Sequence, residues 1–168
     1  MKLNNQYVNY RTAELILSAI QTDIDAHAAH FARMDQIKEE MKDYVYDQGN
    51  DGWSTWDQTI ARVLQSEKKL AAKVGLKSRV EEIDLMINYF NSLTQELKEL
   101  EGKFKDLRRL LWVFEEIAAS GQERYFFHWR QYEPVNSVID SAIKYPDVYK
   151  NSYAAILEHL DCSGIDKT

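Results

Sequence analysis

The sequence is poor in residues that break helices or cross-link chains, with 2 prolines, 6 glycines and 1 cysteine among its 168 residues. The lone cysteine, Cys162, excludes an intrachain disulfide framework and a cysteine-based zinc site. So few prolines and glycines leave long stretches that can form helix without interruption. A single cysteine suits a reducing compartment, so we expect a cytoplasmic protein, of a cell or of an infected host cell.

Long hydrophobic runs are also missing. Nothing approaches the roughly 18 consecutive apolar residues of a membrane-spanning helix. Residues 1–6 are polar and do not resemble a signal peptide. We therefore expect a native N-terminus and no membrane partner.

Basic residues are in deficit. The chain has 21 Lys and Arg against 27 Asp and Glu, which gives a formal net charge of -6. Proteins that bind the nucleic-acid backbone need a surplus of lysine and arginine to displace its counterions, so we do not expect direct nucleic-acid binding.

The residues that are present indicate a folded helical protein. Hydrophobic residues make up 45% of the chain and aromatic residues 12%, which excludes general disorder. A chain of this length buries roughly 70% of the surface that its unfolded form exposes. The sequence predicts one all-helical domain, a bundle over residues 1–168.

The strongest periodic signal is a heptad seam whose apolar residues alternate in steps of three and four for about five heptads. Ser78 and Glu81 form a capping-box pattern just before the seam. The seam predicts a long, coiled-coil-like helix over residues 79–119, and its members are Ile83, Met86, Phe90, Leu93, Leu97, Leu100, Phe104, Leu107, Leu111, Phe114 and Ala118.

Weaker signals predict the other helices. A long N-terminal helix is expected over residues 12–47 and a shorter one from Ser54 to its cap at Gly75. Gly121 should end the long helix, followed by an aromatic segment over residues 122–133. The alternative is a longer helix, because the heptad frame continues to Tyr132 before Pro134 closes it. C-terminal helices are expected over residues 134–161, starting at Pro134 and Pro146.

The seam needs a partner helix. In a parallel homodimer, Glu96 would face Glu101 and Lys103 would face Arg108, and both pairs repel. An antiparallel homodimer would instead place Glu96 near Lys103 of the other chain, twice by symmetry. An equally weighted alternative is that the chain's own N-terminal helix covers the seam. The predicted oligomerisation residues are Phe90, Leu93, Glu96, Leu97, Leu100, Lys103, Phe104 and Leu107.

The densest aromatic stretch spans residues 125–132. Consecutive aromatic residues point in several directions, so one core face cannot bury all of them. Tryptophan, tyrosine and arginine are common binding hot spots. An alternative is that the stretch only plugs the end of the bundle. The predicted partner-binding residues are Tyr125, Phe126, Phe127, Trp129, Arg130 and Tyr132, with a weaker patch at Trp53 and Trp56.

Three clusters have residue types that suit metal binding. Asp23, His27 and His30 share one face of the N-terminal helix, but a buried histidine held by Asp23 explains the pattern more simply. Acidic clusters at residues 39–43 and 81–84 are compatible with magnesium chemistry, but carboxylates at a helix start and on a solvated face explain them as well. We predict no catalytic residue, metal site or cofactor.

The sequence favours a non-catalytic protein–protein interaction module of adaptor or inhibitor type. Its net charge of -6 favours a partner with a basic surface. The competing hypotheses are an all-helical, magnesium-dependent nucleotide hydrolase and a purely structural scaffold oligomer.

Overall fold

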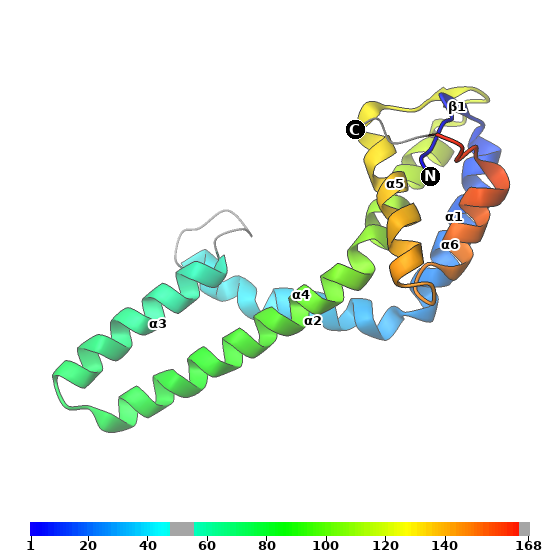
Figure 1. The fold of residues 1–168 in the computed structure, drawn as a ribbon. Helices are drawn as coiled ribbons and strands as arrows, with labels where there is room; N and C mark the ends of the chain where they lie inside the picture. Colours follow the sequence, from blue (N-terminus) through cyan, green and yellow to red (C-terminus); the bar gives the residue numbers. More distant parts are fainter. Residues whose placement is uncertain (48–55, 165–168) are drawn as a thin grey trace. The chain divides into compact units, whose positions relative to one another are not determined.

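A computed structural model describes residues 1–47 and 56–164, and it describes side chains for residues 1–41 and 62–164. The described part is all-α, with six helices and one two-stranded ribbon (Figure 1). The elements are β1 (Tyr7–Val8), α1 (Tyr10–Ala26), α2 (Ala28–Asp47), α3 (Trp56–Lys73), α4 (Lys77–Ser120), β2 (Tyr125–Phe126), α5 (Trp129–Lys144) and α6 (Lys150–His159). The predicted fold class is confirmed.

The long helix α4 agrees with the heptad pattern. It begins at Lys77 and ends at Ser120, within two residues of the predicted bounds. Gly121 follows with a φ of +63°, in the left-handed region that glycine adopts without strain. The predicted end of this helix is therefore confirmed.

The predicted N-terminal helix is interrupted, which corrects its expected continuity. Asn9 caps the start of α1 by accepting a hydrogen bond of 2.8 Å from the Arg11 N–H. At His27 the backbone N–H donates to the carbonyl of Ile24 at 3.1 Å, three residues back, so the α-helical bonding pattern is lost there. The chain then resumes as α2.

The starts of both C-terminal helices also differ from the prediction. Helix α5 begins at Trp129 because His128 and Gln131 form a reciprocal capping box, so Pro134 lies inside the helix. Helix α6 begins at Lys150, with Pro146 in the turn before it. Proline at a first helical turn was the wrong signal at both places.

The chain divides into two compact units. Unit 1 contains Met1–Phe31 and the chain from Gly102 onward, and unit 2 contains Ala32–Glu101. This division does not test the prediction of a single domain.

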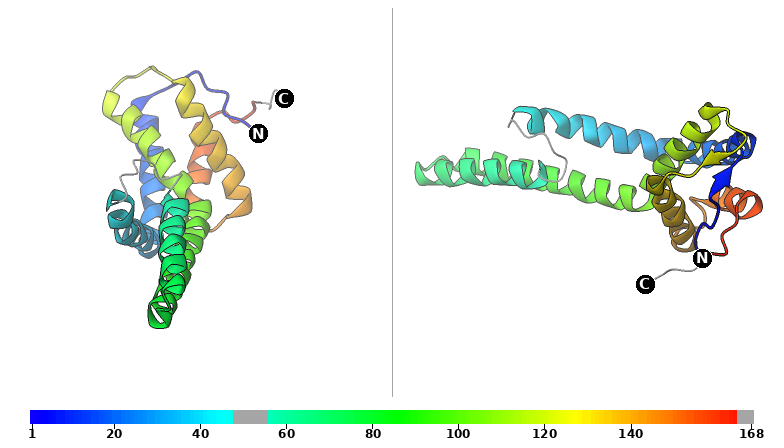
Figure 2. Two further views of the ribbon diagram at one scale, coloured as in Figure 1. Left: turned by 90° about the vertical axis from the view of Figure 1, so that its left-hand side faces the viewer. Right: turned by 90° about the horizontal axis from the view of Figure 1, so that it is seen from above.

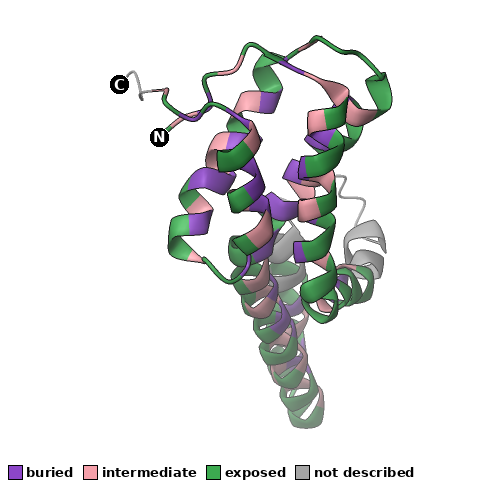
Figure 3. Cartoon of the chain, turned by 90° about the vertical axis from the view of Figure 1, so that its right-hand side faces the viewer, coloured by how far each residue is buried: buried purple, intermediate pink, exposed green. Residues whose placement is uncertain are grey.

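Unit 1 packs α1, α5, α6 and the C-terminal part of α4 around one core. Figure 3 shows the buried residues of these helices turned inward. Leu110 and Ile117 widen the apolar face of α4 here and are fully buried. The Tyr149 hydroxyl, also buried, donates to the Lys103 carbonyl at 2.6 Å. Desolvation, helped by the nearby Asp106 charge, raises the pKa of Tyr149.

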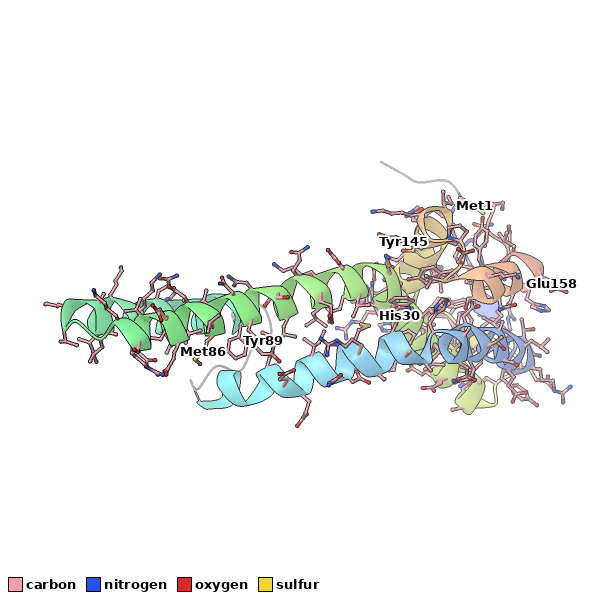
Figure 4. The ribbon with its side chains drawn as sticks, turned by 90° about the horizontal axis from the view of Figure 1, so that it is seen from below. Met1, His30, Met86, Tyr89, Tyr145 and Glu158 are labelled. Atoms are coloured by element: carbon pink, nitrogen blue, oxygen red, sulfur yellow. The ribbon has the colours of Figure 1, made fainter. Side chains whose placement is uncertain are left out.

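Unit 2 contains two antiparallel helix pairs that share α4. Helix α2 runs beside α4 (Figure 2, right, and Figure 4), and Met34, Ile37 and Met41 are buried in unit 2. Helix α3 forms a hairpin with α4 through a turn at Gly75, whose φ is +78°. Ion pairs join α3 to α4, such as Lys68 to Asp84 at 2.7 Å.

Candidate protein-interaction surface

The short ribbon β1–β2 builds one side of the candidate surface in unit 1. Its strands are antiparallel, with Tyr7 opposite Phe126 and Val8 opposite Tyr125. Because successive strand residues point to opposite faces, Val8 is buried while Tyr7 and Phe126 face outward. The ribbon therefore presents two aromatic rings to solvent.

The same alternation anchors part of the aromatic segment to the fold. Phe127 was predicted to contact a partner, but its side chain is only 1% exposed. It therefore belongs to the core. The Tyr132 hydroxyl donates to the Asn5 carbonyl at 2.7 Å, and the Tyr125 hydroxyl accepts from Gln131 at 2.9 Å. These three aromatic residues hold the surface in place.

The other aromatic side chains of this surface are exposed, and arginine side chains stack on two of them. Trp129 is 71% exposed, with the Arg130 guanidinium 5.0 Å from its ring centroid. The Arg124 guanidinium lies 4.1 Å above Tyr7, which makes an edge contact of 5.4 Å with Phe126. Tyr7, Arg124, Phe126, Trp129 and Arg130 form what we call the aromatic–arginine patch.

Sequence reasoning missed two members of this patch. Tyr7 lies more than one hundred residues from the aromatic segment, and only the strand pairing brings it to Phe126. Arg124 lies one residue before the aromatic stretch, so its stacking on Tyr7 depends on the same pairing. The alternating pattern around Tyr7 and Val8 is too short to predict a strand.

The charge of the patch differs from the charge of the whole chain. Arg124 and Arg130 are both exposed, whereas the chain carries a net charge of -6. Of the nearby carboxylates, Glu116 accepts a hydrogen bond from Gln131 at 3.3 Å and Glu133 pairs with Arg109. Glu123 is a third acidic neighbour, and Glu116, Glu123 and Glu133 are all exposed.

The predicted oligomerisation residues lie largely inside the chain's own fold. Phe90, Leu93, Leu97, Phe104 and Leu107 are buried, and Leu100 is half-buried. Self-association through them stays a prediction, but their burial does not require a second copy.

Glu96 also has a partner within the chain. It accepts two hydrogen bonds from Arg33 of α2, one of them 3.1 Å long. This pairing lowers the pKa of the Glu96 carboxyl. Arg33 therefore stabilises the Glu96 carboxylate without the predicted partner, Lys103 of a second copy.

The residues considered for a metal site have structural roles. Asp23 is buried and accepts four hydrogen bonds from Asn151 and Ser152 at the start of α6. His27 and His30 contact Phe104, with the His30 ring stacked on it at 4.8 Å. Among the side chains described, those of residues 1–41 and 62–164, no group of three or more His, Cys, Asp or Glu residues is placed to hold a metal.

Members of the acidic clusters also make structural contacts, some between helices and one within α4. Tyr89 points from α4 toward α2 and donates to Glu40 (Figure 4). Arg79 pairs with Glu82, and Asp84 pairs with Lys68. The side chains of Asp43, Trp53 and Trp56 lie outside the described residues.

Comparisons with known proteins give no family for this chain. No family model, no curated protein and no solved structure matches it at a significant level. None of the helices that the structure describes is both long and apolar enough to cross a membrane.

Proposed function

We propose that this protein is a non-catalytic protein-interaction module that binds a partner through the aromatic–arginine patch. The exposure of Phe126 and Trp129 is the observation that carries the proposal. Large aromatic side chains that remain 62% and 71% exposed gain hydrophobic free energy when a partner covers them, about 1.5–3 kcal/mol for full burial of each.

The arginines of the patch support the same use. A guanidinium stacked on an aromatic ring is held in place before binding, so less side-chain entropy is lost when it meets a carboxylate. Tryptophan, tyrosine and arginine are also the residues most enriched among binding hot spots. The patch combines all three types.

Local charge sets the chemistry of the partner. The net charge of -6 favoured a basic partner, but the patch itself presents Arg124 and Arg130. We therefore propose a partner segment with carboxylates beside an apolar anchor, because opposite charges steer and orient association. An adaptor and an inhibitor would both work through such a patch, and the identity of the partner decides between them.

The test is an affinity pull-down from source-organism lysate with three proteins: the wild type, Trp129→Ala and Trp112→Ala. Trp112 is a matched control because it is another exposed tryptophan of unit 1, on α4. Circular dichroism should show all three folded, since neither ring is part of the core. We expect a stoichiometric acidic partner with the wild type and Trp112→Ala, and its loss with Trp129→Ala.

Two results would contradict the proposal. Equal recovery of the same partner by all three proteins would place the interface away from the patch. No partner for the wild type would remove the interaction function itself.

A further inference from the structure

The α3–α4 hairpin of unit 2 exposes a second set of apolar side chains. Val63, Leu70 and Val74 are spaced by seven and four residues, so they form one row that runs along α3 to the first residue after it. Leu70 and Val74 are more than half exposed. The hairpin packs through a different row, since Leu64 and Ala71 are the buried residues among positions 62–73 of α3, where side chains are described. The apolar row is therefore available on the outside of the helix.

A basic row runs beside the apolar one. Arg62, Lys69 and Lys73 repeat the same spacing one position earlier, about 100° around the helix. All three are exposed. The turn adds one residue of each kind, because exposed Leu76 and exposed Lys77 follow Gly75.

The basic row differs from the other cations of this hairpin. Lys68 and Arg79 are engaged in ion pairs with Asp84 and Glu67. Lys69, Lys73 and Lys77 make no ion pair with any residue that the structure describes. From position 62 to 79 the sequence has six basic residues and one acidic residue, Glu67, within a chain of net charge -6.

We propose that this face of α3 binds the surface of an anionic lipid membrane. Leu70, Val74 and Leu76 enter the boundary between headgroups and acyl chains, and the neighbouring lysines contact lipid phosphates. This is the arrangement of interfacial helices, in which buried apolar area and attraction between lysines and anionic lipids add together.

The size of the face favours a lipid surface over a protein. A stable protein interface takes about 20–30 residues from each side with close shape complementarity. The two rows and the turn supply eight residues, five of them on α3, which suits a fluid surface that needs no fixed shape. Nucleic acid would use the lysines but would leave Leu70 and Val74 in water.

This surface is separate from the aromatic–arginine patch and does not depend on it. The sequence predicted no membrane partner because it contains no apolar run long enough to span a membrane. A helix that lies on the membrane surface needs no such segment.

Co-sedimentation of the full chain with vesicles tests the lysines. Vesicles of phosphatidylcholine alone are compared with vesicles of phosphatidylcholine and phosphatidylserine. We expect binding to the anionic vesicles only, and about a tenfold or greater loss for the triple variant Lys69→Gln, Lys73→Gln, Lys77→Gln. The matched variant Lys103→Gln, Lys105→Gln, Lys150→Gln removes the same charge from other exposed lysines and should bind as the wild type does.

The apolar row needs its own variants. Leu70→Ser with Val74→Ser should weaken binding to the anionic vesicles, whereas Leu15→Ser with Ile143→Ser, also exposed, should not. The proposal is overturned if the wild type ignores anionic vesicles, if both lysine variants lose binding equally, or if the Leu70 and Val74 variant binds unchanged. The last two outcomes would indicate attraction by general charge without insertion.

Discussion

A single buried carboxylate links two helices of unit 1 that are far apart in the sequence. Asp23 of α1 accepts hydrogen bonds from the backbone N–H groups of Asn151 and Ser152, at 3.1 and 2.6 Å. These donors lie in the first turn of α6, where backbone N–H groups have no partner within the helix. Asp23 thus caps α6 from another helix, and the side chains of Asn151 and Ser152 add two further bonds.

Replacing Asp23 with alanine should destabilise the protein by about 2–3 kcal/mol, because buried donors lose their acceptor and α6 loses its cap. Asp25→Ala is the control, since Asp25 is exposed and accepts a side-chain hydrogen bond from Gln21 on the same helix. Urea unfolding followed by circular dichroism measures both. A loss for Asp23→Ala no larger than that for Asp25→Ala would refute the capping role.

Gly102 and Gly121 lie at the two ends of the C-terminal part of α4. Replacing each with alanine should change the stability of the protein in opposite directions. Gly102 has an ordinary helical backbone, and a Cβ there would meet nothing within 4 Å. Gly121 has open space too, but its φ of +63° is costly for any residue with a Cβ. The backbone conformation, and not the available space, separates the two positions.

We therefore expect Gly102→Ala to stabilise the protein by about 0.5–1 kcal/mol and Gly121→Ala to destabilise it by about 1 kcal/mol. Thermal unfolding of the two variants beside the wild type measures both signs. A destabilised Gly102→Ala would mean that another backbone approaches this position, as a packed second copy would do.

The sequence predicted an element correctly where the residues that determine its bounds lie within or next to that element. The bounds of α4 follow from a heptad pattern within the helix and a glycine directly after it. No proline or glycine near His27 predicts the interruption of the helix there. His27 instead contacts Asp147 and Phe104, which come from distant parts of the chain. The start of α5 was missed because its capping residue is His128, which is not among the preferred N-cap types.

In the candidate site, too, local sequence predicted some residues, and long-range contacts decide the others. Trp129 and Arg130 could be selected from their residue types and the crowding of aromatic residues around them. Phe127 could not be separated from its exposed neighbours, because its burial depends on the ribbon with residues 7–8. Tyr7 needs that long-range pairing to join the patch at all.

Across the whole molecule, net charge is a poor guide to the charge of a binding surface. The chain is acidic, yet the aromatic–arginine patch in unit 1 and the outer face of α3 in unit 2 both present exposed cations. Each surface can attract an acidic counterpart at short range, because charges beyond about 10 Å are screened at ordinary salt concentrations.

Burial of the heptad seam within the chain predicts a single-chain mass in solution, 19.7 kDa by light scattering. Lys103→Glu tests the antiparallel homodimer, because it would set the introduced carboxylate of each copy against Glu96 of the other. The Lys103 side chain is exposed, so a monomer should tolerate the change. A double mass for the wild type that falls to the single mass in Lys103→Glu would restore self-association through the seam.

The most direct measurement on the central claim is site-specific photo-crosslinking in source-organism lysate. Benzoylphenylalanine replaces Trp129 in one protein and Trp112 in another, both exposed positions. We expect one partner protein, rich in acidic residues at the linked segment, to crosslink from position 129 and not from position 112. Crosslinks to the same partner from position 112 alone, or from neither position, would contradict binding through the aromatic–arginine patch.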